Sequence, residues 1–252
     1  MNEIFIVNGN YNPLWINSGI QVVISANNAE EFLPRCLESV ESSCKKYNWS
    51  LIFADDDSND KSLDIAKKYV DQSSCQNYII KKFPKAKNVA QAKNRALNLT
   101  DILADKYSTI CIVDSDDEML PARIDYLLPK LIKENEKIIV GDYMLYDTSG
   151  NSQYINATEK NITKDLRFGA WATLFHQSLI PQNGLFFDEN MEVYSDFLKW
   201  WKMRYEDKVN FIFYSGKPVY NFHRRKNSVS GEINQKHTLK IKEEKDRIHK
   251  LV

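Results

Sequence analysis

The sequence has few cysteines, no excess of either charge and no long apolar run. Its 252 residues include four cysteines (Cys36, Cys44, Cys75 and Cys111), which show neither CxxC spacing nor nearby histidines. They are therefore predicted to be reduced thiols in a cytoplasmic protein. Lys plus Arg equals Asp plus Glu, 34 against 34. This balance argues against a protein that binds duplex nucleic acid mainly by neutralising phosphates.

Leader and membrane signals are also missing. The first twenty residues contain Glu3 and lack both a basic cluster and a long apolar core, so no signal peptide is predicted. No stretch approaches eighteen uninterrupted apolar residues, so no transmembrane helix is predicted. Peripheral contact with a membrane stays open. The sequence contains no internal repeat and no low-complexity linker.

Apolar runs alternate with amphipathic segments along the first 145 residues. The runs "QVVISANN", "WSLIFADDDSND", "NYIIKKF" and "STICIVDSDDEM" favour strands, and each is followed by apolar residues at helical spacing. Units of roughly 25 to 35 residues predict βαβ crossovers and a mostly parallel sheet flanked by helices. A hydrophobic content of 43% over this length suits one large α/β domain, with or without a small appendage.

The rest of the chain is less regular. "KIIVGDYMLYD" predicts one further strand, and "YSDFLKWWKMRYED" predicts a helix among aromatic segments and loops. Residues 1–20 are interpreted as an N-terminal extension or edge hairpin. Residues 21–145 form the α/β half, residues 146–234 a smaller second half, and residues 235–252 a charged surface helix.

Polar and acidic residues follow three of the predicted strands, at residues 25–28, 55–60 and 114–118. Ligands of open α/β sheets gather outside the carboxyl ends of the strands, so we expect these residues to converge on one crevice. Neighbouring carboxylates such as those of "DSDD" repel each other unless a cation compensates them. Mg²⁺ takes one or two carboxylates plus substrate phosphates. A metal–diphosphate site is one interpretation of this cluster, and helix capping or a solvated loop is the other.

Six segments in order resemble the motifs of family 2 glycosyltransferases. They are "VVISANNAEEFLPRCLESV", "ADDDSNDKS", "NVAQAKNRAL", "VDSDDEMLPARIDYL", "GLFFDENMEVYSDFLKWW" and "YNFHRRKNSVS", and they cover residues 21 to about 231. The resemblance implies a GT-A fold, in which a Rossmann-like nucleotide-binding half (21–145) is fused to a smaller acceptor-binding half (146–234). This agrees with the βαβ pattern.

The resemblance implies a metal-dependent, inverting transfer of a sugar from a nucleotide sugar. A UDP-sugar is the expected donor, because UDP-sugars are common donors in this family. The acceptor would be a hydroxyl of a saccharide or a lipid-linked glycan at the cytoplasmic face, and the cofactor Mn²⁺ or Mg²⁺. The nucleotide sugar and the acceptor are the expected partners.

Roles for individual residues follow from the same resemblance. Asp196 matches the catalytic base, with an ordinary helix cap as its alternative. The expected metal ligands are Asp116, Asp114 and His223. The expected donor-binding residues are Ala26, Asn28, Asp55, Asp56, Lys93, Asp114, Ser115, Trp171 and Arg224. Among these, Lys93 is placed near the diphosphate and Trp171 against a sugar face, whereas core packing is the alternative for Trp200 and Trp201 inside the predicted helix. Arg224, Arg225 and Lys226 are expected to form a basic loop that closes on the phosphates.

The sequence departs from the family pattern at several positions: Ala26, Asp57 for Gly, Lys93 for Arg and Ser195 for Glu. These departures leave room for a binding module without catalysis. A nucleotidyltransferase of the same fold is a second alternative, against which "ISANNAEEF" lacks a Gly-rich, Arg-containing loop. A transferase acting on a hydroxylated nucleic-acid base is a third. It would use the basic run of Lys81, Lys82, Lys85, Lys87, Lys93 and Arg95 as a phosphate-contacting rim.

Overall fold

The computed structural model describes residues 4–7, 19–103, 108–163, 169–191 and 195–225, together with the single residues 243, 246 and 250. Lys226 and all but those three single residues of the predicted helix at 235–252 lie outside the described residues, as do the side chains of Phe197 and Trp201. Within the described part of the chain, no helix combines the length and apolar character needed to cross a bilayer.

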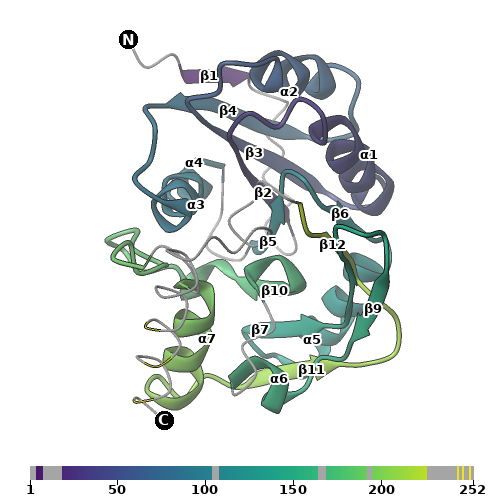
Figure 1. Cartoon of the computed structure of the whole chain (residues 1–252), viewed down its shortest axis with the longest axis vertical. Coiled ribbons are helices and arrows are strands. Elements are labelled where there is room, and N and C mark those ends of the chain that lie inside the picture. The colour runs from purple at the N-terminus through teal and green to yellow at the C-terminus, as the bar shows by residue number, and fades with distance from the viewer. Residues whose placement is uncertain are drawn as a thin grey trace.

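Eight strands form the central sheet, in the order β1-β4-β3-β2-β5-β10-β7-β11 (Figure 1). The parallel part consists of β2 (Ile20–Ala26), β3 (Trp49–Asp56), β4 (Asn77–Phe83) and β5 (Thr109–Asp114). At one edge β1 (Ile4–Val7) runs antiparallel to β4. Beyond β5, the antiparallel β10 (Thr173–His176) pairs with β7 (Ile138–Gly141), and β11 (Phe211–Tyr214) runs parallel to β7. This confirms the predicted mostly parallel sheet, which extends into the second half of the chain.

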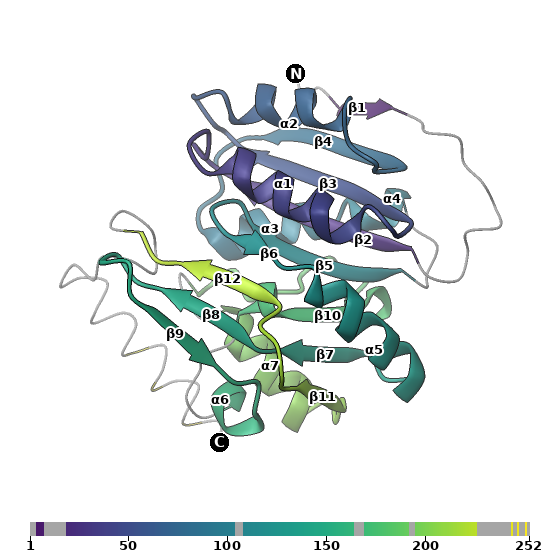
Figure 2. The ribbon, with the colours of Figure 1, turned by 90° about the vertical axis from the view of Figure 1, so that its right-hand side faces the viewer.

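Helices cover both faces of the parallel strands. α1 (Leu33–Cys44), with α2 (Ser62–Val70) beside it, lies on one face, and α3 (Val89–Leu97) lies on the other (Figures 1 and 2). α3 begins where the Asn88 side chain accepts the backbone N–H of Gln91, at 3.0 Å. The remaining helical elements are α4 (Thr100–Leu103), a π-helix (Arg123–Leu127) that continues into α5 (Leu128–Glu134), α6 (Glu159–Thr163) and α7 (Ser195–Tyr205).

A second sheet of four short strands lies on one side of the molecule (Figure 2). Its order is β6 (Glu118–Met119), β12 (Tyr220–His223), β8 (Tyr143–Tyr146) and β9 (Ser152–Ile155). β6 and β12 are antiparallel, β12 and β8 parallel, and β8 and β9 antiparallel. This sheet brings residues 220–223, from late in the chain, next to the acidic segment that follows β5.

The single strand predicted for residues 137–147 is wrong, because the chain passes from one sheet to the other at Asp142. The Asp142 carboxylate is fully buried. It accepts hydrogen bonds from the Ala157 and Gly216 amides, at 2.6 and 2.8 Å, and from the hydroxyls of Tyr154 and Ser215. These contacts turn the chain toward β8. A Cβ on the preceding Gly141 would lie 2.6 Å from the Val219 side chain, so only glycine allows this approach.

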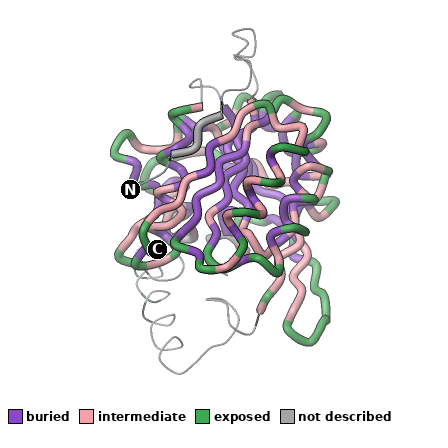
Figure 3. Tube along the Cα trace, turned by 90° about the horizontal axis from the view of Figure 1, so that it is seen from above, coloured by how far each residue is buried: buried purple, intermediate pink, exposed green. Residues whose placement is uncertain are grey.

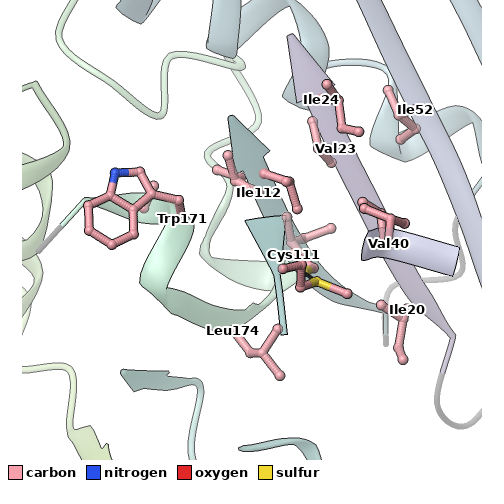
Figure 4. Close-up of a cluster of buried hydrophobic side chains, with 14 of the residues drawn as sticks. Ile20, Val23, Ile24, Val40, Ile52, Cys111, Ile112, Trp171 and Leu174 are labelled. Carbon is pink, nitrogen blue, oxygen red and sulfur yellow. Dashed lines mark hydrogen bonds between the residues drawn. The ribbon is translucent and has the colours of Figure 1, made fainter. Parts of the chain in front are cut away.

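The core lies between the central sheet and its helices. Seen from above, the middle of the molecule is buried and the exposed segments lie at its periphery (Figure 3). Ile24, Val40, Ile52 and Ile112 are each at most 1% exposed and belong to one apolar cluster (Figure 4). Each such side chain contributes roughly 1.5–3 kcal/mol on burial. All four cysteines are free thiols, as predicted.

Candidate functional site

The polar ends of three neighbouring strands meet at the carboxyl edge of the parallel sheet. Ala26 on β2 is in register with Asp55 on β3, and the adjacent Ser25 is in register with Asp114 on β5. The segments that the sequence analysis expected to converge are therefore neighbours. Ala26 itself is only 3% exposed, so its methyl group belongs to the floor of this edge.

Asp55 carries a carboxylate oxygen that lacks a partner. The side chain is fully buried, and its Oδ2 accepts the Ser58 N–H at 3.1 Å and lies 3.9 Å from Lys82 Nζ. Its Oδ1 has no hydrogen-bond partner among the described residues. Leaving a buried acceptor unsatisfied costs about 1–3 kcal/mol, so this oxygen is suited to receive a hydrogen bond from a ligand.

Asn28 ties together the loops that follow β2 and β3. Its backbone has the left-handed φ of 49°, a conformation that asparagine tolerates better than most residues. Its N–H donates to Ser58 Oγ at 3.0 Å, and its Oδ1 accepts the Asn59 N–H at 2.8 Å. The side chain predicted to bind the donor is thus used to shape the loops, although the residue is exposed.

Asp56 is committed to the loop between β4 and α3. Its Oδ1 accepts the Ala86 N–H at 2.6 Å, its Oδ2 pairs with Lys85 Nζ at 2.9 Å, and Arg95 lies 3.7 Å away. The rest of the basic run is also engaged. Lys82 pairs with Asp55 and Asp57, Lys87 with Glu189 and Lys93 with Asp114, while Lys81 lies over the Phe83 ring. Five of the six cations in this run therefore have an acidic partner, which leaves little uncompensated charge in it for nucleic acid.

Residues 114–118 form what we call the acidic turn, closed by the Asp117 N–H donating to the Asp114 carbonyl at 3.1 Å. Two cations of the chain compensate its charge. Lys93 Nζ lies 2.8 Å from Asp114 Oδ1, and Arg225 Nε and Nη2 each lie 2.6 Å from Asp116 Oδ2. Burial and then the Asp114 charge raise the pKa of Asp116, against the opposing effect of Arg225. Ser115 is half-buried in this turn.

His223 is engaged by neighbouring residues of the second sheet and of the acidic turn. Its Nε2 lies 2.8 Å from Glu118 Oε2, and its ring stacks on Tyr146 with centroids 4.8 Å apart. Its backbone N–H donates to Asp117 Oδ1 at 2.7 Å. The imidazole is thus engaged by Glu118, and its role as a metal ligand beside Asp116 stays a prediction.

Lys93 links the acidic turn to the candidate base. Asp196 lies near the start of α7, and its Oδ2 accepts the Ala170 N–H at 3.1 Å. Burial acts to lower the pKa of Lys93, but the charges of Asp114 and Asp196 outweigh it, so the pKa lies above its ordinary value. A single ammonium group therefore interacts with an acid from each half of the chain.

The buried amide of Asn94, next to Lys93 on α3, fixes this arrangement. Its Nδ2 donates to the Phe187 carbonyl at 2.9 Å and to Glu189 at 3.1 Å, and its Oδ1 accepts the Phe187 N–H at 2.8 Å. Gln91, one turn earlier, donates to Glu189 Oε2 at 3.0 Å. These bonds dock the segment that precedes α7 onto α3. Asn94 was not among the predicted site residues, although "NVAQAKNRAL" contains it.

Trp171 packs inside the protein and is 6% exposed. Its indole stacks on Tyr220 and Phe222, at centroid distances of 5.1 and 4.9 Å, and meets Tyr143 edge-on at 4.6 Å. Its place beside the core is visible in Figure 4. We therefore correct the predicted sugar-stacking role to a packing role, because neighbouring aromatic rings already occupy the indole.

The arginine that reaches the acidic turn is Arg225 rather than the predicted Arg224. Arg224 is exposed, and its backbone N–H donates to the Tyr146 carbonyl at 2.9 Å. The run "HRRK" pointed to this segment, but nothing in it distinguishes the two guanidinium groups. Tyr220 was missed as well: its hydroxyl accepts the Asp114 N–H at 2.9 Å.

Comparisons with known proteins bear on the family and the fold of this chain. A family model described as "Glycosyl transferase family 2" matches residues 21–189. Glycosyltransferase GlyG of Streptococcus pneumoniae serotype 4 is 27% identical over 139 residues, which are 55% of this chain and 44% of GlyG. The chain spans less than half the length of the curated relatives it matches.

Two solved structures show the same fold. S. aureus TarS 1-349 in complex with UDP-GlcNAc superposes with a TM-score of 0.67 at 17% identity, over 91% of this chain and 70% of that chain. Mannosyltransferase PcManGT from Pyrobaculum calidifontis, in complex with GDP-Man and Mn²⁺, gives 0.54 at 11% identity, over 83% and 58% respectively. The fold is thus of the GT-A type expected from the sequence.

Proposed function

The chain belongs to glycosyl transferase family 2, and from that premise we propose that it transfers a sugar from a nucleotide sugar to a hydroxyl of a saccharide or glycolipid, with inversion at the anomeric carbon. The observation that supports this best is the position of Lys93, which interacts with Asp114 of the acidic turn and with Asp196. The candidate base therefore lies within electrostatic range of the ammonium group that pairs with the donor-side acids.

The donor is proposed to be a UDP-sugar. The unpartnered Oδ1 of Asp55 lies buried at the carboxyl edge of the sheet, two strands from Asp114. A base N–H of the nucleotide would satisfy this oxygen. The related fold of TarS holds UDP-GlcNAc and that of PcManGT holds GDP-Man. Uracil and guanine both carry N–H donors, so the donor panel below includes both.

The carboxylate oxygens of the acidic turn are suitable ligands for Mn²⁺ or Mg²⁺. Such ions take oxygen ligands and need only one or two carboxylates when substrate phosphates supply the rest. Asp116 and Asp114 offer those oxygens. Within the described residues no group of three or more His, Cys, Asp or Glu side chains forms a ready-made metal site, which agrees with a site completed by the diphosphate. When bound, the ion would offset charge on the leaving phosphate.

The reaction needs a proton acceptor on the acceptor side. Asp196 would take the proton of the acceptor hydroxyl while the oxygen of that hydroxyl forms a bond to the anomeric carbon. The bond from that carbon to the diphosphate oxygen breaks on the opposite face, and its electron pair leaves with the nucleoside diphosphate. The Ala170 N–H holds one oxygen of Asp196 in place. Lys93 limits the repulsion between this carboxylate and the acids that face the donor.

We place the reaction in the cytoplasm, where the four free thiols stay reduced. The acceptor is a saccharide or a lipid-linked glycan that presents a hydroxyl to Asp196. The second half of the chain, from β8 onward, is the part that would select it.

Ligand-induced stabilisation tests the donor site first. UDP- and GDP-sugars are screened by thermal shift with and without Mn²⁺, because a ligand that binds only the folded state raises the melting temperature. We expect one UDP-sugar to stabilise the chain in the presence of Mn²⁺, and Asp116→Asn to abolish that shift. Asp125→Asn, on a face where Asp125 pairs with Lys46 at 3.1 Å, is the control. If no nucleotide stabilises the wild type, the donor site is refuted.

Turnover then separates transfer from mere binding. Release of UDP from the stabilising donor is measured for the wild type and for Asp196→Asn. Loss of a general base typically costs 10²–10⁴-fold in rate, with donor affinity retained. Donor binding without any turnover would favour the binding module instead. Pyrophosphate release from a nucleoside triphosphate and a sugar 1-phosphate would favour nucleotidyl transfer.

A further inference from the structure

One short segment near the end of the described chain holds three of the acids in the acidic turn. The Tyr220 hydroxyl accepts the Asp114 N–H at 2.9 Å, and the His223 N–H donates to Asp117 Oδ1 at 2.7 Å. Arg225 then pairs with Asp116 at 2.6 Å. β12 also pairs with β6, where Tyr220 is in register with Met119. The Asp114 peptide and the Asp117 carboxylate are thus held by β12, whereas Arg225 is the ion-pair partner of Asp116.

The bond from Tyr220 replaces a missing sheet contact. Among the residues that the structure describes, β10 pairs with β5 only at Thr109 and Ile110, and no strand pairs with the carboxyl end of β5 on that side. A backbone N–H at a buried sheet edge needs an acceptor. The Tyr220 hydroxyl supplies one at Asp114, the residue where β5 ends and the acidic turn begins.

The ring that carries this hydroxyl is rigidly held. Tyr220 is fully buried and stacks on Trp171, with centroids 5.1 Å apart and planes at 20°. The Arg123 guanidinium lies 5.5 Å from the same ring and is itself fully buried, with its Nη2 donating to the Thr173 carbonyl at 2.6 Å. The ring is therefore confined by an aromatic plane and by a cation anchored to β10.

We infer that Tyr220 is a positioning residue for the donor site, because its hydroxyl fixes the Asp114 peptide and with it the directions of the Asp114 and Asp116 carboxylates. This inference rests on the proposed function, since it says how the acids that face the donor are aimed. Tyr220 touches no reacting atom and acts through the backbone of Asp114.

Tyr220→Phe tests this, because it removes one oxygen and keeps the stacking. The matched control is Tyr47→Phe, which removes a tyrosine hydroxyl that bonds Asp125 Oδ1 at 2.7 Å, away from the acidic turn. Amide hydrogen exchange of Asp114 is measured without ligand. Donor affinity, donor KM, acceptor KM and kcat are measured well below the melting temperature of each variant.

In Tyr220→Phe we expect faster exchange at Asp114 and a donor Kd and KM raised about fivefold to tenfold, from the loss of one buried hydrogen bond. Acceptor KM should stay within about twofold. Tyr47→Phe should change none of these values. Unchanged exchange in Tyr220→Phe overturns the inference, and so does faster exchange with wild-type donor affinity, because the role would then be structural only. If the wild type binds no donor, the proposed function itself is refuted. If the wild type binds the donor and Tyr220→Phe binds it equally well, only the inference about Tyr220 is refuted.

Discussion

The Arg225 guanidinium pairs with the Asp116 carboxylate, which is the proposed ligand of the metal ion. Removal of this guanidinium is therefore expected to strengthen metal binding. Its Nε and Nη2 both lie 2.6 Å from Asp116 Oδ2. The same guanidinium lies 4.5 Å from the centre of the Phe32 ring. A metal ion that takes both oxygens of Asp116 must displace this contact, and the free energy of breaking it is subtracted from that of metal binding.

The size of the effect follows from the contact. A hydrogen bond to a charged group contributes about 1.5–3 kcal/mol. The side chains of Arg225 and Asp116 are 34% and 16% exposed, so solvent screening favours the lower end of that range. About 1.5 kcal/mol corresponds to roughly a tenfold change in affinity. Arg225→Ala should therefore bind Mn²⁺ about ten times more tightly than the wild type in the absence of nucleotide.

Titration of Mn²⁺, followed by calorimetry or by the paramagnetic signal of the free ion, measures this directly. Arg224→Ala is the matched control, because it removes the same charge from the neighbouring exposed residue and leaves the Asp116 contact intact. An equal gain in Mn²⁺ affinity in both variants would show that the effect comes from the overall charge of the protein rather than from the Asp116 contact. Weaker Mn²⁺ binding in Arg225→Ala would refute the reasoning, since Arg225 would then organise the site rather than compete for it.

Three further outcomes are expected. Asp142→Ala removes the acceptor of two backbone N–H groups, at 2.6 and 2.8 Å. Because each hydrogen bond to a charged group contributes about 1.5–3 kcal/mol, the free energy of unfolding measured in urea should fall by about 3–6 kcal/mol. A loss below about 1 kcal/mol would contradict this expectation. Lys93→Gln should reduce donor turnover about tenfold or more, because Asp114 loses its 2.8 Å ion pair, and wild-type turnover in steady-state assays would contradict it. Burial and the Asp125 hydrogen bond raise the pKa of Tyr47 to about 12, while that bond is the main effect lowering the pKa of Asp125. Tyr47 thus adds stability that is full below its unfolded pKa of about 10 and lost as the pH rises through 12, whereas Asp125 adds stability that is present above about 3.9 and lost as the pH falls. Tyr47→Phe should flatten both limbs of the stability–pH curve, and two unchanged limbs would rule this out.

The parallel half of the fold was predictable because its strands are buried on both faces. Ile110 to Val113 are each at most 1% exposed, so β5 appears in the sequence as an unbroken apolar run. The same rule gave the positions of β2 and β3, whereas β4 is buried only at Ile79 and Ile80. It failed at residues 137–147, where Gly141 and Asp142 interrupt the apolar run and contacts from later in the chain turn it into a second sheet. The partners of Asp142 lie at Tyr154, Ala157 and residues 215–216, and no local pattern announces them.

The site shows the same division between local signal and tertiary context. The sequence indicated which strand ends carry acids, because residue type and strand position are local facts. It did not indicate which polar side chains the protein uses internally. Asn28, Asp56 and His223 each bind another part of the chain, and Trp171 is stacked in the interior. A side chain of suitable chemistry is available to a ligand only if the fold has not already used it.

The negative charge of the acidic turn is compensated by cations of the chain itself, in addition to any bound metal ion. The repulsion between Asp114 and Asp116 first suggested that a metal ion must hold them together. Within the chain itself, Lys93 and Arg225 supply two positive charges, one to each carboxylate. Binding of a metal–diphosphate would therefore require an exchange of partners. If Asp116 held the ion, the Arg225 guanidinium would be released, and its planar fork is well matched to a phosphate. The same group that weakens metal binding in the empty protein would then strengthen donor binding once the ion is in place.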